Sequence, residues 1–187
     1  VYPEKDQSLP ARYARVIATF REPSVDKALE QLDTLLAKHP DDGYFWELQG
    51  QILMESGQPA PARIAYIKAL ELLENAPLIE GDLARAELAI NTKESNKSAL
   101  LHMKSAIHTL GNSAFAWRQL ATAQGRNNMS GALALSLAEE ALLRNRLKDA
   151  IQQAKRSQHH FKRRAPGWLR ALDIEELAKR RLRDRKR

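Results

Sequence analysis

The chain has 187 residues, no cysteine, eight glycines and eight prolines, and only 6% of its residues are aromatic. This composition excludes disulfides and thiol chemistry, and it is typical of a mostly helical protein built from Ala and Leu. The formal net charge of +7 is unevenly distributed: residues 144–187 carry 16 Lys and Arg against five Asp and Glu, a net of +11, and residues 1–143 carry a net of −4.

The hydrophobic periodicity predicts ten helices and no strands. Turn signals separate them, among them Glu22-Pro23-Ser24, Ser56-Gly57-Gln58-Pro59 and Ala165-Pro166-Gly167. In chain order we expect helices over 10–20, 24–38, 43–56, 59–74, 77–90, 96–109, 113–125, 129–144, 147–160 and 165–182.

One pattern of mostly small and apolar residues recurs on the second, fourth, sixth and ninth predicted helices. Its members stand at i, i+4 and i+7, so each set occupies one face of a helix. The second, third and fourth sets follow the preceding set after 34, 37 and 51 residues. The four sets are Ala28, Leu32 and Leu35; Ala62, Tyr66 and Ala69; Ala99, Met103 and Ala106; and Ala150, Ala154 and Ser157.

A period of 34 residues is the length of one tetratricopeptide unit, a pair of antiparallel helices. Twelve residues before three of these sets stands another small or apolar residue, Val16, Gly50 or Ala138. The spacing of 37 is explained by three extra residues, which we place in a long polar loop over 91–98. We therefore predict an all-α tetratricopeptide-repeat solenoid of about ten helices.

The spacing of 51 equals one unit plus one helix. It predicts three repeats, an irregular helix over 113–125, a fourth repeat and a C-terminal capping helix. The alternative is five helix pairs, in which the seventh and eighth helices form a degenerate repeat. We expect a lead-in segment over 1–9, a repeat domain over 10–160, and a capping helix with a basic tail over 161–187.

Several linked segments resemble a known family. They include Tyr44-Phe-Trp-Glu-Leu-Gln-Gly-Gln-Ile-Leu-Met-Glu-Ser-Gly57, Ala116-Trp-Arg-Gln-Leu-Ala121 and Pro166-Gly-Trp-Leu-Arg-Ala-Leu-Asp173. Over residues 9–175 the chain is similar to the C-terminal tetratricopeptide region of bacterial periplasmic zinc metalloproteases of the β-barrel assembly-enhancing type. The resemblance implies a periplasmic location, a separate N-terminal protease domain, and a role in outer-membrane protein quality control. It also implies polypeptide partners: unfolded or assembling outer-membrane proteins, or the barrel-assembly machinery.

The catalytic motif of that family, H-E-x-x-H, is absent from this chain. None of its five histidines stands in such a motif, and we expect them on the surface. No phosphate-binding loop, nucleophile elbow or apolar run of about 18 residues is present. We expect no enzymatic activity, no cofactor, no metal site, no small-molecule substrate and no membrane span. The chain begins with Val1 and without a signal peptide, so we expect it to be a piece of a longer protein.

We expect the first helix of each tetratricopeptide repeat to line a concave surface that binds a polypeptide. Glu47 and Gln51 stand where domains that grip carboxylate tails carry Lys, Asn or Arg, which argues against that class of ligand. Counting from the repeat, the predicted partner-binding residues are Tyr13, Ile17, Tyr44, Glu47, Gln51, Met54, Arg85, Phe115, Arg118 and Thr122.

The basic tail, Lys179-Arg-Arg-Leu-Arg-Asp-Arg-Lys-Arg187, allows a second hypothesis. A freestanding cytoplasmic adaptor would use this tail to bind nucleic acid or an anionic surface. The tail has no interleaved aromatic residues, which disfavours nucleic acid. Cations also stabilise the C-terminus of a helix without binding anything.

Overall fold

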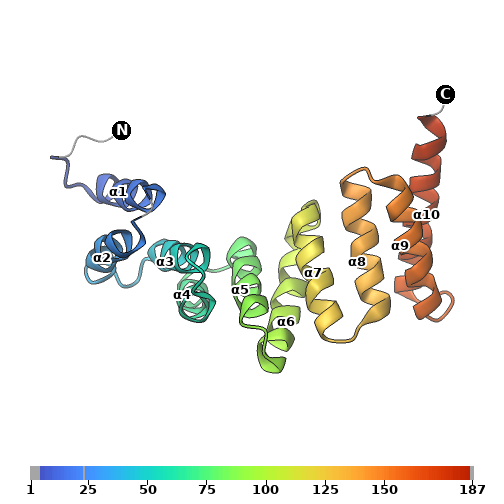
Figure 1. Cartoon of the computed structure of the whole chain (residues 1–187), viewed down its shortest axis with the longest axis horizontal. Helices are drawn as coiled ribbons and strands as arrows, with labels where there is room; N and C mark the ends of the chain where they lie inside the picture. The colour runs from blue at the N-terminus through green and yellow to red at the C-terminus, as the bar shows by residue number, and fades with distance from the viewer. Residues whose placement is uncertain (1–4, 23, 186–187) are drawn as a thin grey trace. The chain divides into compact units, whose positions relative to one another are not determined.

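The computed structural model describes residues 5–22 and 24–185 and contains ten α-helices within them. No strand is found in the described part of the chain. The helices are divided between two compact units, residues 1–90 and 91–187. Figure 1 draws the first unit from blue to green and the second from green to red. The boundary lies between the two helices of the predicted third repeat.

The first unit holds five helices (Figure 1). Consecutive helices pack on each other, and α3 also touches α5. In the first unit they are α1 (Leu9–Arg21), α2 (Val25–Leu36), α3 (Gly43–Glu55), α4 (Pro59–Leu72) and α5 (Pro77–Ile90).

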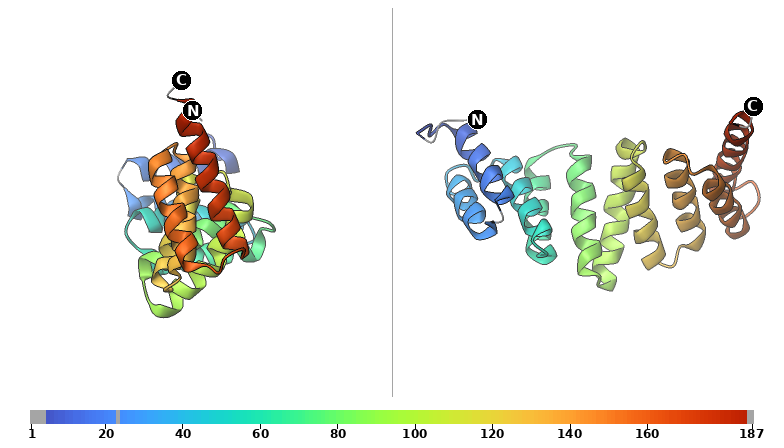
Figure 2. Two further views of the ribbon diagram at one scale, coloured as in Figure 1. Left: turned by 90° about the vertical axis from the view of Figure 1, so that its right-hand side faces the viewer. Right: turned by 45° about the horizontal axis from the view of Figure 1, so that its top comes forward.

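The second unit continues the alternation with five more helices. Here too consecutive helices pack together, and α10 lies against both α8 and α9, which Figure 2 shows side by side. They are α6 (Lys93–Leu110), α7 (Ala114–Arg126), α8 (Ser130–Leu143), α9 (Leu147–His160) and α10 (Pro166–Asp184). The contact of α10 with α8 parallels that of α5 with α3, so α10 takes the place of a next first helix and caps the α8–α9 repeat.

The recurring sets of small and apolar residues form the buried faces of α2, α4, α6 and α9. All twelve members are 0% or 1% exposed. The residues twelve positions upstream, Val16, Gly50 and Ala138, are buried as well. At Gly50 a Cβ atom would lie 2.6 Å from the ring of Tyr66, so glycine lets α3 and α4 approach closely. These contacts confirm the prediction of repeated helix pairs.

The polar member of the fourth set also serves helix packing. The Ser157 hydroxyl, on α9, donates a hydrogen bond of 3.0 Å to the Gly131 carbonyl at the start of α8. The Ser136 hydroxyl, on α8, donates one of 2.8 Å to Gln124 of α7. Each buried hydroxyl has a partner, so it costs little to bury. These bonds join the three helices α7, α8 and α9.

Local signals set the starts of the first helices. Asp42 and Ser113 accept hydrogen bonds from backbone N–H groups and cap α3 and α7. In each helix a tryptophan indole N–H also donates to a carbonyl six residues earlier, at 2.8 Å: Trp46 to Pro40 and Trp117 to Gly111. The start of α7 is thus built like the start of α3, as expected for a first helix.

Many of the turns use left-handed backbone. Gly57 has φ 76°, which costs glycine nothing. Four asparagines in other turns also have positive φ, and asparagine is the residue other than glycine that tolerates this conformation best. They are Asn75, Asn91, Asn128 and Asn145.

The predicted loop over 91–98 is wrong. Thr92 and Ser95 form a capping box in which each side chain accepts a hydrogen bond from the backbone N–H of the other. This box begins α6 at Lys93, and Ser95 and Asn96 are buried. The three extra residues of this repeat therefore lengthen α6 to 18 residues instead of forming a loop.

The buried face of α4 gives a first prediction. Ala62→Leu adds a branched side chain where α4 has no exposed surface, so we expect the free energy of unfolding to fall by about 1–3 kcal/mol. Far-ultraviolet circular dichroism is expected to stay helical while thermal unfolding moves to lower temperature. The control is Ala60→Leu, at an exposed position of the same helix, with little change expected. Equal melting curves for the two variants would contradict the assignment of this face.

Candidate functional site

In the first unit, the predicted partner-binding residues lie on α1, α3 and α5. Tyr44 at the start of α3 is 60% exposed, and Leu78 at the corresponding position of α5 is 67% exposed. Among the other predicted residues Gln51 is exposed and donates a hydrogen bond to Glu55. The remaining five are half-buried: Tyr13, Ile17, Glu47, Met54 and Arg85.

Three of these half-buried side chains also belong to the core. Tyr13 stacks on buried Phe45 with ring centroids 5.5 Å apart, and Ile17 packs against the same buried cluster. Met54 packs against the cluster around Tyr66. These three side chains are therefore partly engaged in helix packing and only partly exposed to a partner.

The carboxylate of Glu47 lies in a protein environment without a cation of its own. Burial, and next the negative charge of Asp82, raise the pKa of Glu47 above its usual value. Burial also raises the pKa of Tyr13, with Glu47 and Asp42 adding to the effect. Within the described residues Glu47 makes no hydrogen bond or ion pair. The charges that act on Glu47 and Tyr13 in this part of the first unit are thus all negative.

Asp82, which pairs with Arg85 on α5, is absent from the predicted site residues. Its carboxylate lies 2.6 Å from the Arg85 guanidinium, one turn along the helix. The i, i+3 spacing of opposite charges was the available signal. Because this pairing engages Arg85, the guanidinium is not a lone cation in the first unit.

In the second unit, the predicted residues Phe115, Arg118 and Thr122 lie along α7. Phe115 is 50% exposed, and the Thr122 hydroxyl donates to the backbone carbonyl of Arg118 at 3.0 Å. The Arg118 guanidinium lies 3.7 Å from the carboxylate of Glu140 on α8. Arg118 therefore has a structural partner besides its exposure to solvent.

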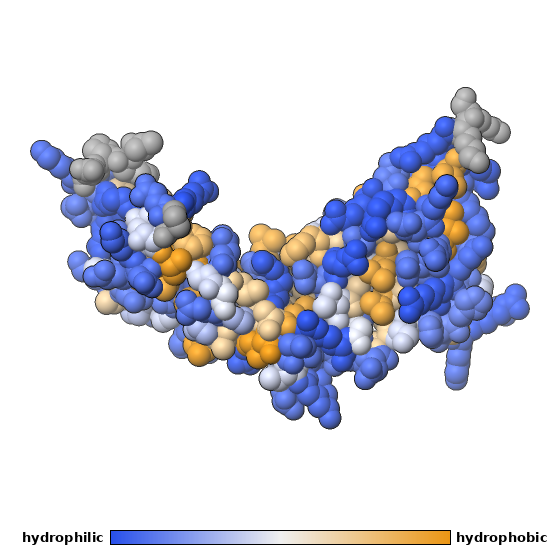
Figure 3. Space-filling model, viewed as in Figure 1, coloured by the Kyte–Doolittle hydropathy of each residue, from blue (hydrophilic) through white to orange (hydrophobic). Residues whose placement is uncertain are grey.

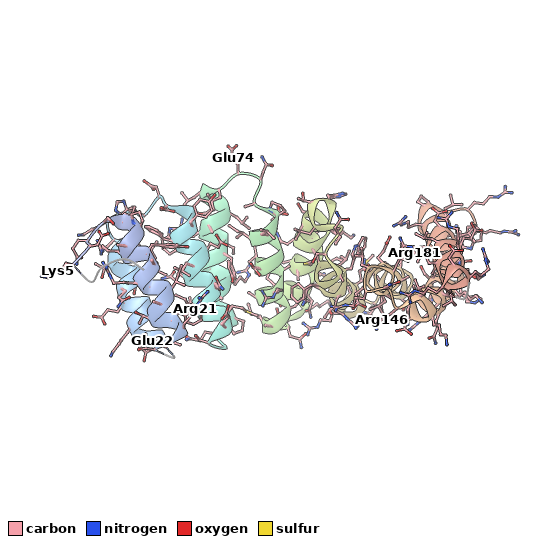
Figure 4. All side chains as sticks on the ribbon, turned by 90° about the horizontal axis from the view of Figure 1, so that it is seen from above. Lys5, Arg21, Glu22, Glu74, Arg146 and Arg181 are labelled. Atoms are coloured by element: carbon pink, nitrogen blue, oxygen red, sulfur yellow. The ribbon has the colours of Figure 1, made fainter. Side chains whose placement is uncertain are left out.

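Glu140 is the centre of a cluster of arginines. Its side chain is only 3% exposed, and both Arg144 and Arg146 donate to it at 2.7 Å. Figure 4 labels Arg146, which precedes α9. Because a buried carboxylate needs partners, these arginines are part of the fold and not a free basic patch.

Two further buried carboxylates join α8, α9 and α10. Glu139 accepts two hydrogen bonds from the Arg170 guanidinium, at 2.6 and 2.9 Å, and this bonding raises the pKa of Arg170. The pKa of Glu175 is lowered. Burial acts to raise it, but the hydrogen bonds from Lys179 and Gln158 together have the larger, opposite effect. None of the three glutamates is among the predicted site residues. Glu139 and its partner Arg170 are 31 residues apart, whereas Glu140 and Glu175 each have a partner four residues later, Arg144 and Lys179, so a local i, i+4 signal was available for these two.

The described residues contain neither a cluster of metal-ligating side chains nor a membrane-spanning helix. No group of three or more His, Asp or Glu side chains in residues 5–22 and 24–185 is arranged to hold a metal ion. Four histidines are exposed as predicted, whereas His102 is half-buried. No helix in the part of the chain that the structure describes is long and apolar enough to cross a membrane.

No protein-family model matches the sequence, and no curated protein sequence matches it. Solved structures do match. The crystal structure of MamA covers 100% of this chain and 99% of its own, with 13% identity and a TM-score of 0.67. The C-terminal part of a TPR repeat-containing protein from Cytophaga hutchinsonii covers 91% of this chain and 69% of its own, with 16% identity and a TM-score of 0.65.

A chain in the crystal structure of the APC/C hetero-tetramer Cut9–Hcn1 is similar too. The match covers 90% of this chain and 36% of that one, with 18% identity and a TM-score of 0.58. At these identities the likeness shows the fold. Together with the ten helices it establishes that the chain is an all-α tetratricopeptide-repeat solenoid.

The Glu139–Arg170 pair gives a prediction about stability. Arg170→Ala leaves a buried carboxylate without its two hydrogen bonds, so we expect a loss of about 1–3 kcal/mol in the free energy of unfolding. The control is Arg180→Ala, an exposed position on the same helix, for which about 0–0.5 kcal/mol is expected. Urea unfolding of the two variants measures the difference, and equal losses would show that the pair does not hold α10.

The raised pKa of Glu47 predicts a pH dependence. Between the unfolded and the folded pKa the folded state binds more protons than the unfolded state, so the stability attributable to this residue falls as pH rises through that window. Glu47→Gln removes the effect. We therefore expect the variant to melt higher than the parent at pH 7, with the difference vanishing below the unfolded pKa. A variant that melts lower at pH 7 would mean that Glu47 has a stabilising partner.

Proposed function

We propose that this chain is a protein–protein interaction module that binds a polypeptide on the exposed surface of its first helices. The observation that carries the proposal is the exposure of Tyr44 and Leu78 at matching positions of α3 and α5, two helices that touch. Exposed aromatic and apolar side chains beside polar ones are typical of interfaces. In Figure 3 exposed apolar side chains, drawn in orange, lie among hydrophilic ones.

The residue types on the predicted binding surface of α1, α3 and α5 support a polypeptide ligand over a small molecule. Tyrosine buries a large area at a low cost in side-chain entropy, methionine adapts its shape, and Glu47 and Gln51 can bond to a peptide. One of the similar structures is a hetero-tetramer, as its name states, so this fold occurs in protein assemblies. Both points support the same class of partner.

For the biological setting, we propose the non-catalytic C-terminal half of a periplasmic zinc metalloprotease that acts in outer-membrane protein quality control. The support is the similarity of the linked segments, among them Tyr44–Gly57 and Pro166–Asp173. In this setting an N-terminal domain supplies the zinc and the proteolysis, and this chain docks the substrate or the barrel-assembly machinery. An H-E-x-x-H motif encoded upstream of Val1 would support this setting, and a complete gene without one would contradict it.

A second candidate function rests on the charge of the second unit. Residues 91–187 carry 21 Lys and Arg against eight Asp and Glu, a net of +13, and several exposed basic residues lie on α10. Arg181, labelled in Figure 4, is one of them. A freestanding adaptor would use this end to bind nucleic acid or an anionic surface.

Tyr44 separates the two functions. With a fluorescently labelled unfolded outer-membrane protein as probe, we expect Tyr44→Ala to weaken binding by about 5–30-fold, the effect of truncating an interface anchor. The control is Ile64→Ala, a 64% exposed apolar residue on α4, a second helix, and it is expected to bind like the parent. Fluorescence anisotropy measures the affinity.

Charge reversal at Arg181 and Arg183 completes this experiment. The polypeptide hypothesis predicts a small effect confined to low salt, because exposed charges are screened over about 8 Å at physiological ionic strength. The nucleic-acid hypothesis predicts a large loss of binding to labelled DNA with a steep salt dependence. Parent protein that binds DNA and no polypeptide would overturn the proposed function.

A further inference from the structure

The first-helix surface of the first unit contains an acidic side chain that the fold does not neutralise. Glu47 projects from α3 without a hydrogen bond or ion pair among the described residues, and its close charged neighbour Asp82 is also an acid. In contrast, each buried glutamate of α8 and α10 has Arg or Lys partners. A half-buried carboxylate that lacks a partner costs free energy, and this cost is recovered when a cation binds.

A second polar group points at the same place. Tyr66 is 1% exposed, and its ring fills the space left by Gly50 of α3. Within the described residues its hydroxyl makes no hydrogen bond. The charged groups that act on this hydroxyl belong to α3 and α5, namely Asp82, Arg85, Glu47 and Glu55. The ring carbon that bears this hydroxyl lies 2.9 Å from where a Cβ of Gly50 would stand, and Gly50 follows Glu47 by one helical turn, so the phenol lies on the face of α3 that carries Glu47.

Aromatic rings complete the surroundings of Glu47. Tyr13, which α1 supplies, is held in place by its stacking on Phe45 and feels the charge of Glu47. Tyr44 lies one turn before Glu47 on α3 and is largely exposed. The faces of such rings attract cations.

The charge of the whole unit agrees with this local picture. Residues 1–90 carry nine Lys and Arg against 15 Asp and Glu, a net of −6. Of the nearby cations, Arg85 is engaged with Asp82 at 2.6 Å. The first unit thus repels anions and attracts a positively charged segment.

We propose that Glu47, with the Tyr66 hydroxyl and the rings of Tyr13 and Tyr44, binds a lysine or arginine side chain of a partner polypeptide. The inference rests on the proposed function and names the ligand chemistry of that surface. The carboxylate of Glu47 accepts hydrogen bonds from the cation, the Tyr66 oxygen accepts another, and the rings cover its methylene stem. Tyr44 and Leu78 contact the flanking residues of the same polypeptide.

This chemistry excludes two other occupants. A C-terminal carboxylate or a phosphate would meet Glu47 and Asp82 and be repelled. An uncharged apolar peptide would leave Glu47 without a partner and lose further water from it. The unpaired Glu47, which destabilises the free protein, therefore also makes this surface specific for a cation.

Two matched peptides test the proposal. Both are 15 residues long, built of Gly, Ser and Leu, with three evenly spaced lysines in one and three glutamines in the other. They are titrated into the ¹⁵N-labelled protein at low salt, and the amide shifts of α3 and α5 are followed by nuclear magnetic resonance. We expect the lysine peptide to shift these amides and to bind at least about tenfold more tightly than the glutamine peptide, as charged hydrogen bonds do.

Three variants localise the effect, and two of them, Glu47→Gln and Glu74→Gln, have the same net charge. Glu47→Gln is expected to remove the preference for the lysine peptide, and Tyr66→Phe to weaken it by about threefold or more, the loss of one ordinary hydrogen bond. Glu74→Gln, in the exposed turn after α4 that Figure 4 labels, is expected to bind like the parent. Amide spectra of α1 and α2 that match the parent show that the first unit of each variant is folded.

Each other outcome overturns the proposal in a distinct way. Equal binding of both peptides, at amides of α3 and α5, contradicts the cation site and leaves the proposed function intact. No shift of these amides with either peptide contradicts both. Concentration-dependent dimers that Glu47→Gln dissociates, seen by sedimentation, show that the occupant is the basic end of a second copy instead of a partner polypeptide.

Discussion

Close approach of paired helices is the constraint on which the rest of this structure depends. Ala28, Ala62, Ala99 and Ala150 occupy equivalent, fully buried points on the second helices. A larger side chain at such a point forces the helices apart, because protein interiors have no spare volume. Gly50 shows the limit of the constraint, since even a methyl group there would meet the Tyr66 ring.

This packing decides which residues are left for a partner. Each first helix packs one face against its second helix, so residues on its opposite face remain exposed to solvent. Tyr44 and Leu78 are exposed for this reason, and Tyr13 is held half-exposed by Phe45. The basic character of the second unit is in part structural, because Arg144, Arg146 and Arg170 neutralise glutamates that packing has buried. The net charge alone suggests a basic binding patch, although these three arginines are paired with buried glutamates.

The extent of the sequence prediction follows from how local each signal is. Helix existence and the buried faces were predictable, since the i, i+4, i+7 sets repeat and all twelve members are buried. The start of α6 was mistaken, because Thr92-Lys-Glu-Ser95 reads as a polar loop unless its reciprocal capping is recognised. The Glu139 pair was not predictable because Arg170 comes from a distant helix, whereas Glu140 and Glu175 each have a partner four residues later, Arg144 and Lys179, which the sequence does indicate. The placement of Tyr13 and Tyr66 against α3, on Phe45 and Gly50, likewise depends on the packing of helices that are distant in the sequence.

Site-specific photo-crosslinking tests the central claim, that polypeptide binds along the first helices, most directly. A benzoylphenylalanine at position 44 on α3 is compared with one at position 64 on α4, two positions of similar exposure. Both proteins are irradiated with an unfolded outer-membrane protein, and the adducts are mapped by mass spectrometry. The account predicts crosslinks from position 44 and almost none from position 64. Equal crosslinking from both positions, or crosslinking from position 64 alone, would contradict it.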